Sequence, residues 1–250
     1  MKNKKTFLIQ FWIDLKLFFR EPLYVSLILI LPAIFFLIFA SMYSGESYGN
    51  MNYFQKYIPG FVSQIMYATT IFSVGVQLVI DKEQGVFRMI KASPVKMKNI
   101  FGVVIIKGYF ICIIGLLEII AIAKFVFKSE LTEHWGVFAI AFLYATTVLL
   151  IIGFLVSCAF DNLKTAIAVL MITFYPVFFL SDANIPLNIL PQIMQKIAII
   201  NPLYHINIIL REAWSGKFII NSSENASFIY LMIISIICIW GSYILLKKDN

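Results

Sequence analysis

The chain has 250 residues, of which 61% are hydrophobic and only 13% are charged, and its formal net charge is +7. A water-soluble domain averages about 25% charged residues, so this composition excludes a soluble enzyme and predicts a protein embedded in lipid. The lysines and arginines lie between apolar runs and at the chain ends, without interleaved aromatics. They therefore indicate membrane orientation and argue against nucleic-acid binding.

Residues 5–20 form the first predicted element, an amphipathic helix lying in the membrane interface. At roughly 100° per residue its aromatic side chains gather on one half, while Asp14 and Arg20 fall on the polar half. A cytosolic helix packed on a partner is the alternative. Proline cannot continue the hydrogen-bond ladder, so the helix ends just before Pro22. The residues assigned to this helix and its end are Phe11, Trp12, Phe18, Arg20, Glu21 and Pro22.

Six apolar runs follow that are candidates to cross a bilayer, which takes about 20 residues of helix. The predicted fold is thus an all-α polytopic membrane protein with six transmembrane helices, forming a single transmembrane domain over residues 1–250. The predicted spans are 23–43, 57–80, 100–127, 135–160, 165–180 and 228–246.

The loop at 81–94 is the most charged part of the chain. Val86, Met89 and Ile90 recur at i, i+3 and i+4, which predicts a short helix with an apolar ridge suited to a partner's groove. A negative charge at Glu83 favours the start of such a helix. The alternative is an ordinary basic loop that only fixes topology. The residues assigned to this loop are Asp81, Glu83, Gly85, Val86, Phe87, Arg88, Met89, Ile90 and Pro94.

The segment 181–227 is too apolar for a solvated loop, yet prolines divide it into runs too short to span. We expect a re-entrant segment that begins and ends outside, because irregular backbone at membrane depth survives only where protein or a water-filled cavity covers it.

Three charged residues fall inside the third span. Glu118 is a candidate for the substrate path or a subunit contact, with a protonated, hydrogen-bonded carboxyl as the alternative. Lys107 and Lys124 are interpreted as lysines whose side chains reach the two membrane interfaces.

Motifs for chemistry are absent from the sequence. It has no GxxxxGK[ST] phosphate loop, no HExxH and no GxSxG, so no catalytic residue, metal ligand or cofactor is assigned to this chain. The lysines and arginines concentrate at the N-terminus, in the 81–94 loop and at the C-terminus, which predicts that both termini are cytosolic.

Along nearly its whole length the chain resembles the membrane subunits of type-two ABC exporters. The features that carry the resemblance are the helix ending in Arg20-Glu21-Pro22, the loop DKEQGVFRMIKASPV, and the outer apolar segment after the fifth span. Within that segment, Asn201-Pro202-Leu203-Tyr204 and Arg211 are similar to the family's Asn-Pro-Leu-x-Tyr and following arginine. Tyr204 comes one position early, and His205 stands in the usual tyrosine place.

The resemblance implies that two such chains pair and that each docks a separate cytosolic ABC ATPase, which binds ATP and magnesium. The contacts would come from the interfacial helix and the 81–94 loop, and the outer segment would form the gate. A separate small permease chain indicates a bacterial plasma membrane, and drug-like or lipid-like substrates are favoured over polysaccharide. The residues so implicated in the path or gate are Glu118, Asn201, Pro202, Tyr204 and Arg211.

Two other functions remain open from the sequence. A secondary transporter or channel would need no ATPase, although no inverted repeat is evident. A membrane immunity or structural protein would sequester a ligand without transport.

Overall fold

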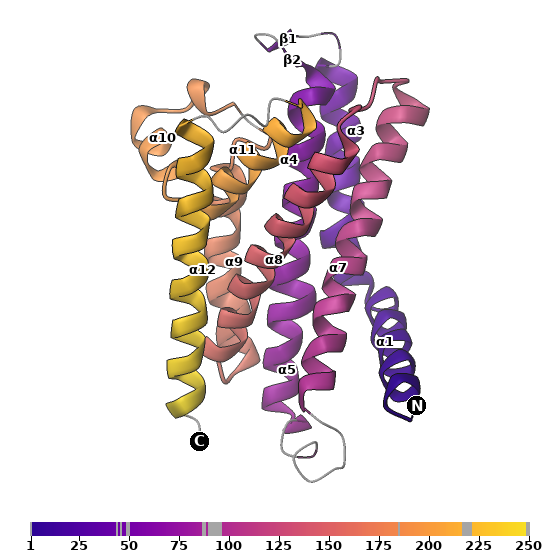
Figure 1. Ribbon diagram of the computed structural model, residues 1–250, viewed down its shortest axis with the longest axis vertical. Helices are drawn as coiled ribbons and strands as arrows, with labels where there is room; N and C mark the ends of the chain where they lie inside the picture. The colour runs from indigo at the N-terminus through magenta and orange to yellow at the C-terminus, as the bar shows by residue number, and fades with distance from the viewer. Residues whose placement is uncertain are drawn as a thin grey trace.

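The computed structural model describes the chain except residues 1, 44, 46, 49–50, 87–88, 90–96, 185, 217–221 and 249–250. Its described elements are helices, apart from one antiparallel pair of two-residue strands, β1 (Ser47–Tyr48) and β2 (Met51–Asn52). Long helices run side by side in a bundle whose two chain ends lie at the same end (Figure 1). The predicted all-α polytopic membrane fold is confirmed.

The end of the bundle that carries both chain ends is named the inner end, and the opposite end the outer end (Figure 1). The first half of the bundle begins with α1 (Lys2–Arg20), which lies next to α7 beside the inner part of the bundle. The first span combines α2 (Pro22–Val25), the π-helical η1 (Ser26–Ile30) and α3 (Leu31–Tyr43). The second combines α4 (Tyr53–Ala68), η2 (Thr69–Val76) and α5 (Gln77–Glu83). The third combines α7 (Met97–Ala121) with η3 (Ile122–Val126).

The second half begins with the fourth span, α8 (Trp135–Ala159), and continues with α9 (Leu163–Phe179). At the outer end follow a short 3-10 turn, η4 (Leu187–Ile189), then α10 (Gln192–Ala198) and α11 (Pro202–Trp214), and α12 (Ser222–Lys248) returns to the inner end. Among the residues that the structure describes, five helices are long and apolar enough to cross a membrane. The bent pair α10 and α11, at 78° to each other, is a further candidate if it counts as one broken span.

The predicted fifth span is the shortest of the six. α9 has 17 residues, which at about 1.5 Å each give about 25 Å, less than the roughly 30 Å of a bilayer core. Its ends therefore need polar partners supplied by the protein itself, because lipid offers none.

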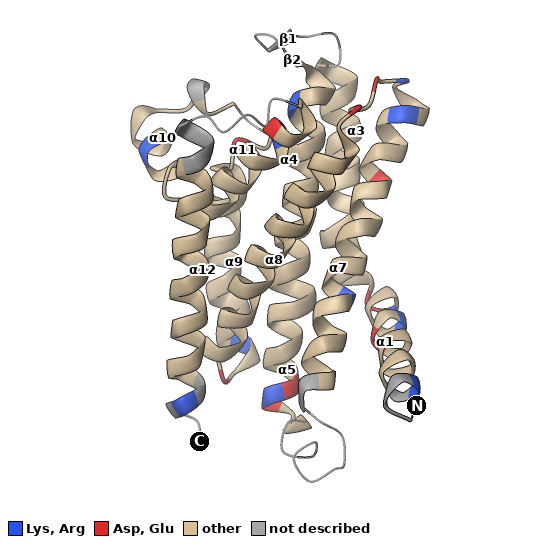
Figure 2. Cartoon of the chain, viewed as in Figure 1, with Lys and Arg blue, Asp and Glu red and all other residues tan. Residues whose placement is uncertain are grey.

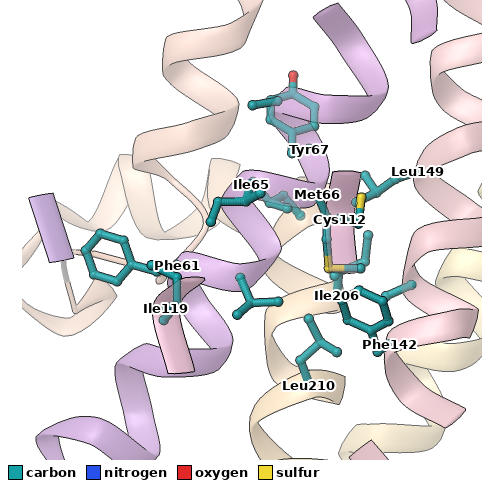
Figure 3. Close-up of a cluster of buried hydrophobic side chains, with 14 of the residues drawn as sticks. Phe61, Ile65, Met66, Tyr67, Cys112, Ile119, Phe142, Leu149, Ile206 and Leu210 are labelled. Atoms are coloured by element: carbon teal, nitrogen blue, oxygen red, sulfur yellow. The ribbon is translucent and has the colours of Figure 1, made fainter. Parts of the chain in front are cut away.

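The second span forms the centre of the bundle. In its most apolar stretch 89% of the residues are buried, against 17% in α12, which lies at the edge. Figure 3 shows Phe61, Ile65 and Met66 of this span packed among side chains of α7, α8 and α11. Any movement at the inner end of this helix is thus transmitted directly into the core.

Charged residues gather at the two ends of the bundle, with few between them (Figure 2). This distribution is the one expected of a protein whose middle lies in hydrocarbon. The inner end carries the two chain termini and the loop after α5, whereas the outer end carries β1, β2, α10 and α11 (Figure 1).

Candidate functional site

The break at the end of the interfacial helix falls where the sequence predicted it. α1 ends at Arg20, Glu21 lies between the helices, and Pro22 is the first residue of α2, where its missing N–H costs nothing. The N–H of Glu21 still donates to the carbonyl of Phe18, at 3.1 Å. Arg20 and Glu21 are both exposed.

The faces of α1 differ from the simple amphipathic prediction. Phe18 is buried, and the Phe11 ring meets Phe110 of α7 edge to face at 5.6 Å, whereas the neighbouring Trp12 is exposed. Asp14, expected on the polar half, is half-buried toward the bundle. The reason is that α7 covers part of the polar half of α1, which the sequence of α1 alone does not reveal.

The helix α5 ends just before Gly85, the glycine of the sequence Glu83-Gln84-Gly85. Gly85 has φ +72°, a left-handed conformation that favours glycine, and its N–H donates to the carbonyl of Lys82. A new helical turn begins there, because the N–H of Met89 donates to the carbonyl of Gly85 at 3.1 Å. Val86 is half-buried and Met89 is exposed. Phe87, Arg88, Ile90 and Pro94 lie outside the described residues.

Glu83 lies against a different helix from the one expected. Its carboxylate accepts hydrogen bonds from the N–H of Leu163 at 3.2 Å and from the side chain of Asn162 at 3.4 Å. Asn162 is itself the N-cap of α9, accepting from two further N–H groups. Glu83 therefore adds negative charge at the positive end of α9 and not at the helix that follows Gly85.

A second contact joins the same two places. Lys82 forms an ion pair with Asp161 at 2.5 Å, just before α9 begins. Asp81, one residue earlier, accepts a hydrogen bond from Gln77 at 3.1 Å and is half-buried. The last residues of α5 are thus tied to the short link between α8 and α9.

At the outer end, Arg211 of α11 clamps the turn that follows α9. Its guanidinium donates to the carboxylate and to the backbone carbonyl of Asp182, both at 2.9 Å. The other carboxylate oxygen of Asp182 accepts from the N–H of Leu187, and the residue has φ +57°. Both charged side chains are largely buried, each 14% exposed, so the pair holds a strained turn in place.

Two asparagines of the outer segment bind the carbonyls at the end of α9. Asn201 caps α11 through the N–H of Leu203 and donates to the carbonyl of Val177 at 2.7 Å. Asn207 donates to the carbonyl of Ser181 at 3.1 Å. These acceptors lie in or just after the last turn of α9, where helical carbonyls have no partner within the helix.

His205, and not Tyr204, makes the polar contacts at the position of the family's tyrosine. Its Nε2 lies 2.8 Å from the carbonyl of Ile199 and so donates to it, and its Nδ1 lies 3.0 Å from the hydroxyl of Ser227 on α12. The ring packs against Tyr230 with centroids 4.1 Å apart. Tyr204 is half-buried and meets His205 edge to face. Pro202 occupies the first turn of α11.

Close backbone contact also fixes the outer junction. A Cβ atom on Gly60 of α4 would stand 2.6 Å from the carbonyl oxygen of Ala183, closer than real Cβ contacts. Only glycine allows the central helix to approach this turn so closely.

The two lysines of the third span were both expected at a membrane interface, but only one of them is exposed. Lys124 is exposed near the outer end, as expected, but Lys107 is buried with 4% exposure, so its assignment to an interface is wrong. Glu118 is half-buried, and its Oε2 has no hydrogen-bond partner among the residues that the structure describes.

An apolar cavity of about 480 Å³ lies in the inner half of the bundle, between α7, α8, α12 and the second span. Its lining is almost entirely hydrocarbon and aromatic. The polar exceptions include a hydroxyl pair, Tyr109 and Thr147, with oxygens 2.6 Å apart. Its volume falls in the range of drug-sized binding sites, about 300–1,000 Å³. The lining includes Val74, Val104, Leu150, Ile151, Phe154 and Tyr243.

Several residues of these sites carry no motif that marks them in the sequence. Asp182 is 29 residues from Arg211, so the two are not linked by a sequence pattern. Asp161 and Asn162 lie in the short link between α8 and α9, which contains no functional motif. An Asn directly before an apolar helix is an N-cap signal, so Asn162 could have been found. The partners of Glu83 and Arg211 could not, because they depend on how the helices pack.

Comparison with known proteins places the chain among transport proteins. The family described as "ABC-2 type transporter" matches residues 5–214. The chain is 26% identical over 215 residues to the Daunorubicin resistance ABC transporter permease protein DrrB1 of Streptomyces coeruleorubidus, covering 82% of this chain and 73% of that protein. It is 23% identical to the Putative transport permease ycf38 of Cyanophora paradoxa, covering 74% of this chain and 65% of that protein.

Proposed function

The chain belongs to the ABC-2 type transporter family, and we propose that it works as a dimer coupled to a separate ABC ATPase to export drug-like or lipid-like molecules. Membership makes it a transporter membrane subunit. In this proposal, the ATPase binds ATP and magnesium. This chain forms the path by which the substrate crosses the membrane. Both termini lie in the cytosol of a bacterial cell, at the inner end of the bundle.

The observation that carries ATPase coupling is the exposed apolar side chain of Met89 on the turn after α5. Met89 is 64% exposed, at the charged inner end, where no residue that the structure describes covers it. An apolar side chain among charges suits a partner's groove, and burying it releases about 25 cal/mol per Å². The turn continues directly from the most buried span, so force applied at Met89 reaches the core.

The preference for drug-like or lipid-like substrates is supported by the apolar cavity. A sugar polymer requires many hydrogen-bonding groups, whereas this lining offers few, the Tyr109 and Thr147 hydroxyls among them. The relative from Streptomyces coeruleorubidus is named for daunorubicin resistance, which agrees with a drug-like substrate.

The outer junction supports the assignment of 181–227 to a gate. Polar contacts of Arg211, Asn201 and His205 join α10 and α11 to the end of α9 and to α12, in addition to the apolar packing of α11 in the core. In the proposed gate, these polar contacts are the ones that exchange when the path opens. Helices α9 and α10 also present exposed apolar side chains, including Ile172 and Ile193, which a second copy would cover in a dimer.

The test is the substitution Met89→Asp in the chain co-expressed with an ABC ATPase from the same genome that co-purifies with the wild type. A carboxylate at this position cannot enter an apolar groove, so the variant should insert normally but lose most export. Export into inside-out vesicles, ATP hydrolysis and co-purification of the ATPase are measured together. Met89→Leu, which keeps the apolar surface, is the matched control and should behave as the wild type.

Wild-type export and association in Met89→Asp would reduce the loop to a topology signal. Export by the wild type without any ATPase would instead establish the ATP-independent transporter. Binding of the substrate without movement across the membrane would favour a sequestering protein.

A further inference from the structure

Lys107 is buried deep in the inner half of α7. It lies ten residues from Met97, the first residue of the helix, which is about 15 Å along the axis at about 1.5 Å per residue. Its side chain is too short to reach the inner end of the helix from there, and its exposure of 4% contrasts with the exposed Lys124 near the outer end of the same span. A lysine in such a position requires partners of opposite charge.

Two carboxylates from two other elements supply that charge. Asp14 of α1 and Asp81 of α5 both interact electrostatically with Lys107, and they also repel each other. Burial raises the pKa of the Asp14 carboxyl above its ordinary value, and the charge of Lys107 acts in the opposite direction. Lys107 thus compensates two like charges that the fold brings together from α1 and α5.

Packing fixes α7 at the level of this lysine. A Cβ atom on the adjacent Gly108 would stand 2.9 Å from the side chain of Leu150 and 3.2 Å from that of Val74, so α7 lies close to both α8 and η2. On the other side, the ring of Phe7 lies against Gly102, and Phe11 meets Phe110. Because α7 is in close contact on both sides, the backbone that carries Lys107 is held in place between α1 and the second span.

The residues after Asp81 extend this arrangement to α9. Lys82 pairs with Asp161, and Glu83 binds the first turn of α9. The inner end of α5 is therefore connected to α1 and α7 through one residue and to α9 through the next two.

We propose that Lys107 is a positioning residue. It holds the inner end of α5, and with it the start of the 81–94 loop, in a constant position relative to the interfacial helix α1. The position of α5 relative to α1 is a property of the isolated chain. The effect of Lys107 on coupling to the ATPase rests on the proposed function. Without the positive charge, Asp14 and Asp81 repel each other, and α1 and α5 separate.

The first experiment measures position without any ATPase. Spin labels are attached at Lys16→Cys and Gln84→Cys, two exposed positions on α1 and just after α5, in a background lacking the native cysteines and reconstituted in nanodiscs. Lys107→Met should replace one narrow distance distribution by a broad one, whereas Lys107→Arg and the matched control Lys124→Met should keep it narrow. Adding Asp14→Asn to Lys107→Met removes the repulsion and should narrow the distribution again.

The second experiment measures coupling in the complex with the ATPase. Lys107→Met should lower export per ATP hydrolysed by about tenfold, within the range typical of coupling between two sites, while association is kept. Lys107→Arg should restore export, which a loss of general stability would not allow.

An unchanged distance distribution in Lys107→Met would overturn the inference, and so would one that stays broad after Asp14→Asn is added. If Lys107→Met does not fold, Asp14→Lys decides the matter, because a second positive charge facing Lys107 should broaden the same distribution, and an unchanged distribution would overturn the inference. Failure of the wild type to bind an ATPase would overturn the proposed function, yet the nanodisc measurement would still decide the role of Lys107.

Discussion

The carboxylate of Glu83 at the inner end of α5 accepts a hydrogen bond from the backbone N–H of Leu163, with 3.2 Å between oxygen and nitrogen. α9 begins at Leu163 and ends at Phe179, directly before the turn that Arg211 clamps. One short helix therefore connects the start of the inner loop with the outer junction. A displacement of Glu83 has a direct route to the other side of the membrane.

The N-cap of α9 is the first prediction. Asn162→Ala removes the acceptor for two N–H groups and should lower the free energy of unfolding by about 1 kcal/mol. Thermal unfolding in detergent, followed by tryptophan fluorescence, measures the change. Lys164→Ala, an exposed substitution in the same turn, is the control, and equal unfolding temperatures in the two variants would contradict the cap.

The outer ion pair gives the second prediction. Removing one partner of a buried pair costs about 3–5 kcal/mol, and the residual exposure of this pair places Arg211→Met near the lower end. The unfolding temperature should fall by several degrees, and more than in Lys196→Met, which removes an exposed lysine from the same segment. A fall no larger than that of the control would show that the clamp adds no stability.

The third prediction concerns topology. Single cysteines at Lys5, Lys196 and Lys247 are exposed at the two ends of the bundle, in a background lacking Cys112, Cys158 and Cys238. An impermeant thiol reagent applied to intact cells should label only the cysteine at position 196. Labelling at position 247 from outside would mean that the 181–227 segment crosses the membrane.

The fourth prediction fills the apolar cavity. Ile151→Trp adds an indole to its wall and should lower the rate of export of an amphiphilic drug about tenfold, which corresponds to about 1.4 kcal/mol of lost binding. Ile140→Trp, on the exposed face of the same helix, is the control and should export normally. Equal export by both variants would exclude the cavity from the path.

The fifth prediction addresses the seating of α1. Trp12→Asp places a charge on the exposed apolar face, so α1 should leave the interface more often and be cut severalfold faster by protease in inside-out vesicles. Lys16→Asp also adds a carboxylate to α1, but at a position that is already charged, and should leave the cutting rate close to that of the wild type. Similar rates in all three proteins would mean that α1 is held by α7 alone.

The long helices and the helix starts at Pro22 and Pro202 could be predicted from the sequence because hydropathy and proline act locally, whereas the re-entrant course of 181–227 stays a prediction. Apolar length identified the long helices, and Pro22 and Pro202 lie where α2 and α11 begin. Helix packing could not be predicted in the same way. Lys107 was assigned to an interface because nothing in its neighbourhood along the chain shows that α1 and α5 bring carboxylates to it.

The same limit applies to the candidate sites. The motif around Asn201 and Arg211 was found, but its physical role depends on Val177 and Asp182, which lie 24 and 29 residues away. Glu83 was assigned to the helix after it in the sequence, whereas its acceptor geometry selects α9. The sequence shows which residues are charged, but the packing of the helices determines which partner each of them meets.

The buried second span also constrains how the protein is made. It is the least hydrophobic of the long helices, with a mean hydropathy of 1.4 against 2.3–2.8 for the others, and it contains Gln64, Thr69, Thr70 and Ser73. Release from the translocon into lipid depends on hydrophobicity, so this helix alone is a poor substrate for that step. Since α7 and α8 cover it and are synthesised later, biogenesis requires it to wait beside the translocon until they emerge. Slowed translation shortly after α5 would then give more degraded protein than the same delay after α8.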